Sequence, residues 1–190
     1  MFTGLIREIA NVKSLSGSTL SIRAKYKAKL GDSIAINGAC LTVVKVLGDG
    51  FSVELSPESQ KLLAMENYKN EVHIEPAMMM GDRFEGHVVQ GHVDTIGTIK
   101  KIQNSGNSFD VFIEVEKKFI AYIVPKGSIT IDGVSLTVND VNGTIFRRMP
   151  TVNEPDNWHD NKGYKGATKR IQAFVYDSEV GLEEIKYFYL

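Results

Sequence analysis

An internal repeat limits the folds open to this chain: residues 33–51 and 128–146 are two versions of one pattern. With a shift of 95 residues, segment 33–43 falls on segment 128–138, and seven of the eleven positions are identical. Three further pairs extend the match, namely Val46/Val141, Gly48/Gly143 and Phe51/Phe146. Chance rarely produces such agreement at a fixed offset, so we expect a duplicated structural unit. A shift of 90 places residues 1–6 on 91–96, which predicts about five extra residues in the second copy.

The repeated segments have the pattern of short β-strands. Residues 33–36 and 41–46 are rich in β-branched side chains and alternate between apolar and polar. Asn37-Gly38 and Asp132-Gly133 predict tight turns, because glycine adopts positive φ without steric cost. Short strands at this spacing indicate a closed barrel or a sandwich. The 190 residues allow two such units of roughly 90 residues each, and a unit of that size has a small core.

Composition argues against several classes of protein. The formal net charge is -1 and no basic run stands out, which argues against a nucleic-acid binder. Cys40 is the single cysteine, so no disulfide can form within the chain, as is typical of a reducing compartment. No apolar run approaches the roughly 18 residues of a membrane helix, and the first residues do not resemble a secretion signal. We therefore expect a cytoplasmic protein with no membrane partner.

Three segments carry residues suited to chemistry: 37–42, 86–94 and 126–137. Cys40, in the first, is read either as a small core residue or as a reactive thiol. In the second, His87 and His92 lie among glycines that let a ligand approach the backbone closely. Their spacing matches no strong zinc motif, so we expect no metal. Ser135, in the third, takes the place of Cys40, which suggests that the two copies no longer do the same job.

Four motifs in this order resemble riboflavin synthase of the α-chain type. They are Met-Phe-Thr-Gly at residue 1, Asn-Gly-Ala-Cys-Leu-Thr-Val at 37, Gly-His-Val-Val-Gln-Gly-His-Val-Asp at 86 and Ile-Asp-Gly-Val-Ser-Leu-Thr-Val at 131. The resemblance implies an all-β chain of two six-stranded Greek-key barrels, with a short C-terminal helix. We therefore expect lumazine-binding barrels at residues 1–88 and 89–180, and a helix at 181–190 that could contact another subunit.

The resemblance also implies an activity. Members of that family convert two molecules of 6,7-dimethyl-8-ribityllumazine, by transfer of a four-carbon unit, into riboflavin and 5-amino-6-ribitylamino-pyrimidinedione. The reaction needs no metal or redox cofactor. The active sites lie between the subunits of a homotrimer, and an association with lumazine synthase is part of the same expectation. Holding two copies of one substrate in stacking register would supply much of the rate.

Site residues follow from the matching motifs. The candidates for catalysis are His92, Cys40, Ser135, Ser33 and Asp132. His92 is a candidate for proton transfer near neutral pH. The nucleophile is a side chain such as Cys40 or Ser135, or a water molecule. The candidates for substrate binding are Gly4, Leu5, Ile6, Leu41, Thr42, Ser56, Glu58, Ser59, Gly91, Val93, Lys126, Leu136 and Thr137.

Some of these residues also have plainer interpretations. Asp132 is equally well explained as a turn residue before Gly133. His87 is interpreted as structural, and Ser56, Glu58 and Ser59 belong to a loop suited to hydrogen-bonding a polyol.

Beyond Phe146 the family pattern fades, and residues 153–163 have the composition of a polar loop. This fading favours an alternative, a non-catalytic lumazine- or flavin-binding protein of the same fold that serves as a fluorescent antenna. The retained motif residues favour the enzyme. A nucleic-acid-binding barrel is a third hypothesis, and the lack of an aromatic and basic stripe argues against it.

Overall fold

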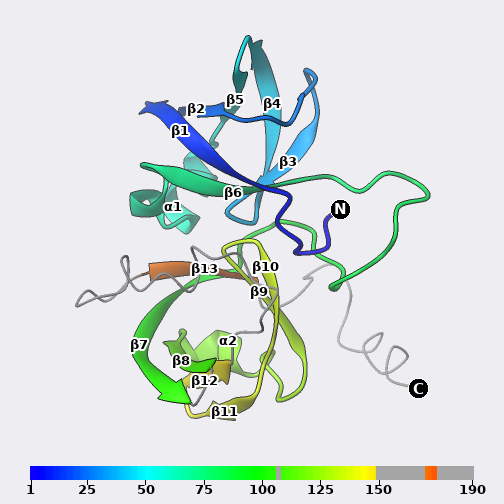
Figure 1. Cartoon of the computed structure of the whole chain (residues 1–190). Helices are drawn as coiled ribbons and strands as arrows, with labels where there is room; N and C mark the ends of the chain where they lie inside the picture. The colour runs from blue at the N-terminus through cyan, green and yellow to red at the C-terminus, as the bar shows by residue number, and fades with distance from the viewer. Residues whose placement is uncertain (106–107, 149–169, 175–190) are drawn as a thin grey trace.

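The computed structural model describes residues 1–105, 108–148 and 170–174, which form two β-barrels (Figure 1). The first barrel contains β1 (Glu8–Ser16), β2 (Thr19–Arg23), β3 (Ser33–Ile36), β4 (Ala39–Leu47), β5 (Gly50–Glu54) and β6 (Glu71–Pro76). Its strands close in the order β1-β2-β5-β4-β3-β6. Between β5 and β6 lie the short helix α1 (Pro57–Leu62) and the 3₁₀ turn η1 (Met65–Asn67).

The second barrel repeats this arrangement. It contains β7 (Thr95–Ser105), β8 (Ser108–Glu114), α2 (Lys117–Ile120), β9 (Ser128–Ile131), β10 (Val134–Thr137), β11 (Asp140–Asn142), β12 (Ile145–Arg148) and β13 (Arg170–Phe174). The hydrogen-bonded order is β10-β9-β13-β7-β8-β12-β11. Only Val138 and Asn139 separate β10 from β11, so these two strands together take the place of β4. Counted in this way, the second barrel has the six-stranded Greek-key order of the first, which confirms the predicted duplication.

The two predicted turns have matching geometry. Asn37 and Asp132 both have φ of 47°, and the glycines that follow, Gly38 and Gly133, have φ of 85° and 87°. Positive φ at two successive residues is typical of the type I′ hairpin turn, which Asn-Gly and Asp-Gly favour. The turns join β3 to β4 and β9 to β10, as the repeat predicts.

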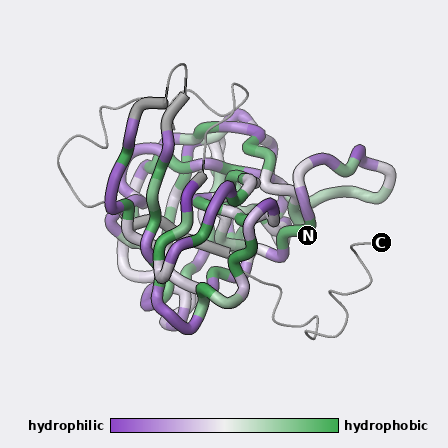
Figure 2. The backbone as a smooth tube through the Cα atoms, turned by 90° about the horizontal axis from the view of Figure 1, so that it is seen from below, coloured by the Kyte–Doolittle hydropathy of each residue, from purple (hydrophilic) through white to green (hydrophobic). Residues whose placement is uncertain are grey.

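Alternation along the strands gives each barrel its own apolar core, and Figure 2 shows hydrophobic and hydrophilic residues alternating along the chain. Phe51 and Phe146, which are equivalent in the repeat, are both 0% exposed and lie in the first and second core. The next residue, Arg147, faces outward on β12. Its guanidinium donates to the Asp110 carboxylate at 2.8 Å. This register places the apolar face of β12 inside the barrel.

The barrels exchange short segments. Residues 1–6 leave the first barrel, and Ile6 packs against the second core, whereas Val93 packs against the first core. The Ser135 N–H donates to Gly4 O and the Cys40 N–H donates to Gly91 O, both at 2.8 Å. Phe2 and Val89 form an antiparallel bridge between the two segments.

The exchange makes Gly4 equivalent to Gly91, a shift of 87 residues. The predicted shift of 90 for this segment is therefore wrong by three residues. The predicted domain boundary at residue 88 falls in the connection between β6 and β7, next to Val89, which forms the bridge with Phe2. The predicted C-terminal helix at 181–190 lies outside the described residues.

Candidate functional site

A pocket of about 370 Å³ opens on the first barrel. Three elements line it: the start of β4, helix α1 with the residue after it, and the exchanged segment 91–94. The lining residues are Ala39, Cys40, Glu58, Ser59, Leu62, Leu63, Gly91, His92, Val93 and Asp94. The volume is within the range of small-molecule sites. Six residues predicted from the sequence, Cys40, Glu58, Ser59, Gly91, His92 and Val93, thus meet in one space.

The exchanged segment approaches β4 so closely that its glycine is required. Gly91 has φ of 89°, and a Cβ atom built there would lie 2.7 Å from Cys40 Cβ and 3.0 Å from the Phe2 ring. Contacts this short force neighbouring atoms to move, and positive φ disfavours any larger residue. The close approach brings His92 and Val93, which follow Gly91, to the pocket wall beside Cys40.

Cys40 is a half-buried thiol rather than an activated one. Burial raises its pKa, and the N-terminal amine and a hydrogen bond with Ser33 offset part of that rise. A raised pKa keeps the thiol protonated at neutral pH, whereas reactive cysteines carry a lowered pKa. The structure therefore brings the predicted Ser33 and Cys40 into contact, and Cys40 can donate a hydrogen bond to a ligand.

Helix α1 forms another part of the pocket wall. Ser56 caps its N-terminus, because Ser56 Oγ accepts from the Ser59 N–H at 3.0 Å, and Pro57 begins the helix. Proline fits the first helical position, where its missing N–H has no intrahelical partner. The cap fixes the turn that carries Glu58 and Ser59 into the pocket. Ser56 itself does not line the pocket.

The corresponding junction of the second barrel joins Gly4, Ser135 and His87. Ser135 Oγ lies 2.6 Å from His87 Nδ1, and Thr130 Oγ1 lies 3.0 Å from His87 Nε2. Burial lowers the pKa of His87 to about 4, so the imidazole is neutral at pH 7. A neutral ring accepts from one of these hydroxyls and donates to the other, so the pair of hydrogen bonds fixes the orientation of the Ser135 hydroxyl and the His87 ring. In the sequence, Gly86 and Gly91 on either side of His87 were the signal that this segment approaches another part of the chain.

Glu75 anchors the exchanged N-terminal segment. Its carboxylate, 3% exposed, accepts from the Thr3 N–H at 2.7 Å, the Thr3 hydroxyl at 2.8 Å and the Gly4 N–H at 3.0 Å. Burial raises the pKa of Glu75, and these hydrogen bonds and Arg7 oppose part of the rise. Since Gly4 O in turn holds the Ser135 N–H, Glu75 links the first barrel to the second junction. No pattern in the sequence distinguished Glu75 from an ordinary strand residue.

The remaining predicted residues lie outside the pocket. Leu41 and Leu136 are each 5% exposed and belong to the two cores, so only their backbone could meet a ligand. Thr42 and Thr137 are exposed, and each lies two residues after Cys40 or Ser135 in the same strand. Leu5 and Ile6 are half-buried where the N-terminal segment meets the second barrel.

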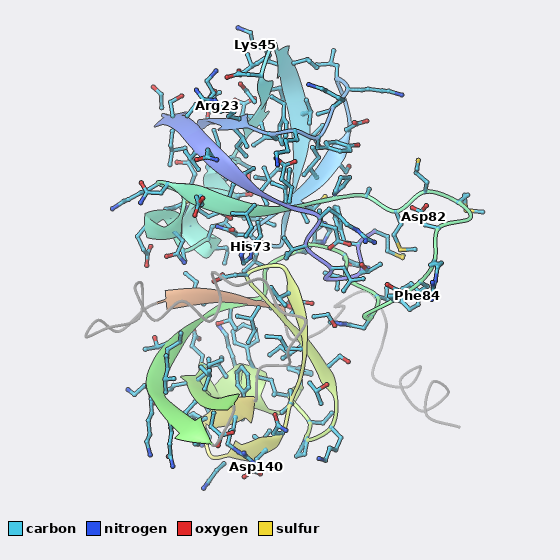
Figure 3. The ribbon with its side chains drawn as sticks, viewed as in Figure 1. Arg23, Lys45, His73, Asp82, Phe84 and Asp140 are labelled. Carbon is cyan, nitrogen blue, oxygen red and sulfur yellow. The ribbon has the colours of Figure 1, made fainter. Side chains whose placement is uncertain are left out.

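Asp132 and Lys126 both have unusual backbone conformations. Asp132 is a buried turn residue whose carbonyl O lies 2.9 Å from His73 Nδ1, between the barrels (Figure 3). A carbonyl only accepts, so Nδ1 carries the hydrogen. Lys126 is exposed with φ of 70°, where the first copy has Gly31 with φ of 87°. A lysine in that conformation is strained, and such strain is concentrated at functional sites.

Two absences hold for the described ranges. Within residues 1–105, 108–148 and 170–174, no group of three or more His, Cys, Asp or Glu side chains is placed to hold a metal ion. Over the same ranges, the search for a helix long and apolar enough to cross a membrane finds none.

Comparisons with known proteins agree with this geometry. The family model of the lumazine binding domain matches twice, at residues 3–77 and 90–153. Riboflavin synthase of Photobacterium phosphoreum is 40% identical over 157 residues, which cover 77% of this chain and 72% of that protein. The enzyme of Bacillus subtilis (strain 168) is 37% identical over 147 residues, covering 73% of this chain and 68% of that protein.

A solved structure shows the same fold. LumP complexed with riboflavin superposes with a TM-score of 0.78 at 19% sequence identity, covering 93% of this chain and 100% of that one. The two matched regions of the family model start at residues 3 and 90, a shift of 87, as the junction glycines require. By its repeated domain and its relatives, this chain belongs to the riboflavin synthase family of lumazine-binding-domain proteins.

Proposed function

We propose that this protein is a riboflavin synthase that acts on two molecules of 6,7-dimethyl-8-ribityllumazine. One molecule donates a four-carbon unit to the other, and the products are riboflavin and 5-amino-6-ribitylamino-pyrimidinedione. The observation that carries the proposal is the pocket on the first barrel, where Cys40 and His92 share one space with Glu58 and Ser59. A flat ring needs the wall with Cys40 and His92, and a polyol chain needs hydrogen-bonding groups such as Glu58 and Ser59.

The two walls have separate roles. The Glu58 carboxylate accepts hydrogen bonds from the hydroxyls of the ribityl chain, and the Ser59 hydroxyl both accepts and donates. His92 takes a proton from the acidic methyl group of the lumazine ring, and the Cys40 thiol hydrogen-bonds the ring. Because the Cys40 pKa is raised, water is the better nucleophile unless the thiol first loses its proton to a base in the pocket.

The second junction supplies the other half of the reaction. Ser135 and His87 form a hydroxyl–imidazole pair at 2.6 Å, which positions the Ser135 hydroxyl for polar assistance; the lowered pKa of His87 makes the imidazole a weak base. The first copy has a thiol at this place and the second has a hydroxyl, which fits one substrate used in two roles. Ser33, Asp132, Lys126 and Thr137 are assigned to the same pair of half-sites on the family motifs alone.

The assembly is part of the same proposal. We expect a cytoplasmic homotrimer in which the first half-site of one subunit faces the second half-site of its neighbour. The family motifs support this arrangement, and so does the placement of Cys40 and Ser135 at two separate junctions of one chain. No cofactor is required, and association with lumazine synthase is an extension of the proposal.

One assay tests the activity. Purified protein mixed with 6,7-dimethyl-8-ribityllumazine, with no addition, should form riboflavin, followed by its visible absorbance. His92→Ala should lower turnover far more than it lowers lumazine affinity. Tight binding of lumazine with no riboflavin formed would contradict the enzyme and support an antenna protein. That alternative is favoured by the end of the family match at residue 153.

A further inference from the structure

The two exchanged segments are related by one constant offset. Gly4 and Gly91, whose carbonyls bind the opposite barrel, are 87 residues apart. Ile6 and Val93 have the same separation, and they pack against the second and the first core respectively. Strands β1 and β7 keep the offset, since they begin at residues 8 and 95. The two segments are therefore equivalent position by position, from the junction glycine to the start of the strand.

This offset makes Arg7 the counterpart of Asp94. Each is the last residue before its strand, β1 or β7. Asp94 lines the first-barrel pocket together with Cys40. Since Ser135 is the counterpart of Cys40, the equivalent place in the second half-site lies beside Ser135 and carries the exposed Arg7. A guanidinium thus stands in the second copy where the first copy has a carboxylate.

The charged and titratable groups around Arg7 leave its guanidinium able to act on a ligand. Glu75 of β6 is an acidic neighbour, since Arg7 opposes the rise in the Glu75 pKa. The Glu75 carboxylate is 3% exposed and already accepts three hydrogen bonds from Thr3 and Gly4. The His87 imidazole beside Ser135 is neutral at pH 7, because burial lowers its pKa to about 4. A ring bound beside Ser135 would therefore meet the positive charge of Arg7.

We propose that Arg7 is a substrate-binding residue of the second half-site, where its guanidinium stabilises the negative charge of a lumazine ring that has lost a methyl proton. The inference rests on the proposed function, since it assumes that a lumazine ring binds beside Ser135. In the proposed assembly this ring lies opposite the pocket that carries His92.

The charge that Arg7 stabilises comes from the first step of the reaction. When the C–H bond of the methyl group breaks, the proton passes to a base and the electron pair stays on the ring. There the charge is delocalised onto the carbonyl oxygens of the pyrimidinedione. A guanidinium donates to such oxygens through a planar fork of N–H groups, and its positive charge favours the ionised ring over the neutral one.

The proton loss of bound 6,7-dimethyl-8-ribityllumazine is the direct test. Its absorption changes when the methyl proton leaves, so rapid mixing over a series of pH values records the midpoint before riboflavin accumulates. The full chain is mixed with two equivalents of lumazine, at concentrations that fill both half-sites. Arg7→Gln should raise the midpoint for bound lumazine by about one pH unit, the effect expected of one charge near a partly solvated ring.

Turnover supplies a second measurement of the same variant. Arg7→Gln should lower kcat about tenfold near neutral pH and leave KM within about threefold, because the charge acts on the ionised ring rather than on the neutral substrate. The pH profile of kcat should move upward with the midpoint. Arg7→Lys keeps the charge but not the planar fork, so its midpoint and kcat should be intermediate.

Arg23→Gln is the matched control, since it removes the same charge from an exposed arginine of β2, away from the junction between the barrels (Figure 3). It should leave the midpoint and kcat unchanged. An Arg7→Gln midpoint equal to that of the wild-type chain would overturn the inference, as would equal shifts in Arg7→Gln and Arg23→Gln. If Arg7→Gln fails to fold, Arg7→Lys decides the matter, and a wild-type midpoint and kcat there would overturn the inference.

The two measurements also separate this inference from the proposed function. A chain that forms riboflavin, with a midpoint and kcat that do not depend on Arg7, keeps the function and loses the inference. A chain that forms no riboflavin, but binds lumazine with an Arg7-dependent midpoint, keeps the inference about the site and loses the enzyme. A chain that does not bind lumazine loses both.

Discussion

At the level of single residues, Gly4 and Gly91 mark the points where the exchanged segments meet the opposite barrel. A Cβ on Gly4 would lie 2.6 Å from Ser135 Cβ, and one on Gly91 would lie 2.7 Å from Cys40 Cβ. Each glycine also presents its carbonyl to the backbone N–H of the residue it touches, at 2.8 Å. The positions of Cys40 and Ser135 thus depend on the absence of a side chain opposite each of them.

Gly91→Ala should lower the free energy of unfolding by about 2–4 kcal/mol, from left-handed backbone strain and the clash with Cys40. Ligand binding at the first pocket should fall with it. Gly17→Ala is the control, because Gly17 also has positive φ, 58°, but has nothing within 4 Å of the added atom. Gly17→Ala should lower the free energy of unfolding, measured by urea denaturation, by only about 1 kcal/mol. Equal losses in the two variants would show that the junction has room for a methyl group.

His87 should make stability depend on pH. Its pKa is lowered from 6.5 to about 4, so between these values the unfolded chain binds a proton that the folded chain excludes. His87 therefore does not reduce the free energy of unfolding above pH 6.5. As pH falls from 6.5 toward 4, it lowers that free energy by up to about 3 kcal/mol. Urea unfolding between pH 7 and 4.5 should show a smaller loss in His87→Gln than in the wild-type chain.

The informative quantity is the difference in pH dependence of stability between the wild-type chain and His87→Gln. Glu75 works in the opposite direction, since an acid with a raised pKa gains stability as pH falls. Both chains contain Glu75, so its contribution cancels. If His87→Gln retains the wild-type dependence of stability on pH, His87 is not held neutral by burial.

At the level of elements, helix α1 is short and depends on its cap. Ser56→Ala removes the oxygen that binds the Ser59 N–H, which should cost about 1 kcal/mol and weaken riboflavin binding by loosening Glu58 and Ser59. Ser56→Thr keeps the oxygen and should restore both stability and affinity. Urea unfolding and fluorescence titration measure the two effects. An unchanged stability in Ser56→Ala, with affinity lost, would favour the direct ligand contact that the sequence predicted.

The sequence predicted local elements better than their meeting points. The Asn-Gly and Asp-Gly turns and the strands around them follow from local backbone preferences, so the repeat located them correctly. The equivalence of Gly4 and Gly91 was missed because it rests on contacts across barrels. Four pocket residues were missed: Ala39, Leu62, Leu63 and Asp94. The first three look like ordinary apolar residues, and the position of Asp94 depends on where the exchanged segment lies. The Ser135–His87 pair joins residues 48 apart, so spacing alone could not predict it.

At the scale of the whole molecule, the exchange makes each barrel depend on the other. Ile6 completes the second core and Val93 completes the first, while Glu75 fixes the N-terminal segment that carries Gly4. Cores of this size are marginal by themselves. The exchanged segments therefore should couple the barrels, so that neither keeps its structure after the other has unfolded.

Phe51→Leu and Phe146→Leu test this coupling, because the two residues occupy equivalent places and are both 0% exposed. Each change should cost roughly 1–1.5 kcal/mol, since the volume is nearly kept but the ring contacts are lost. In a coupled molecule either variant lowers hydrogen-exchange protection by the same free energy in β2 and β5 of the first barrel and in β8 and β9 of the second. If each variant affects only its own barrel, the barrels unfold independently. The exchanged segments would then position the two half-sites without contributing to cooperativity.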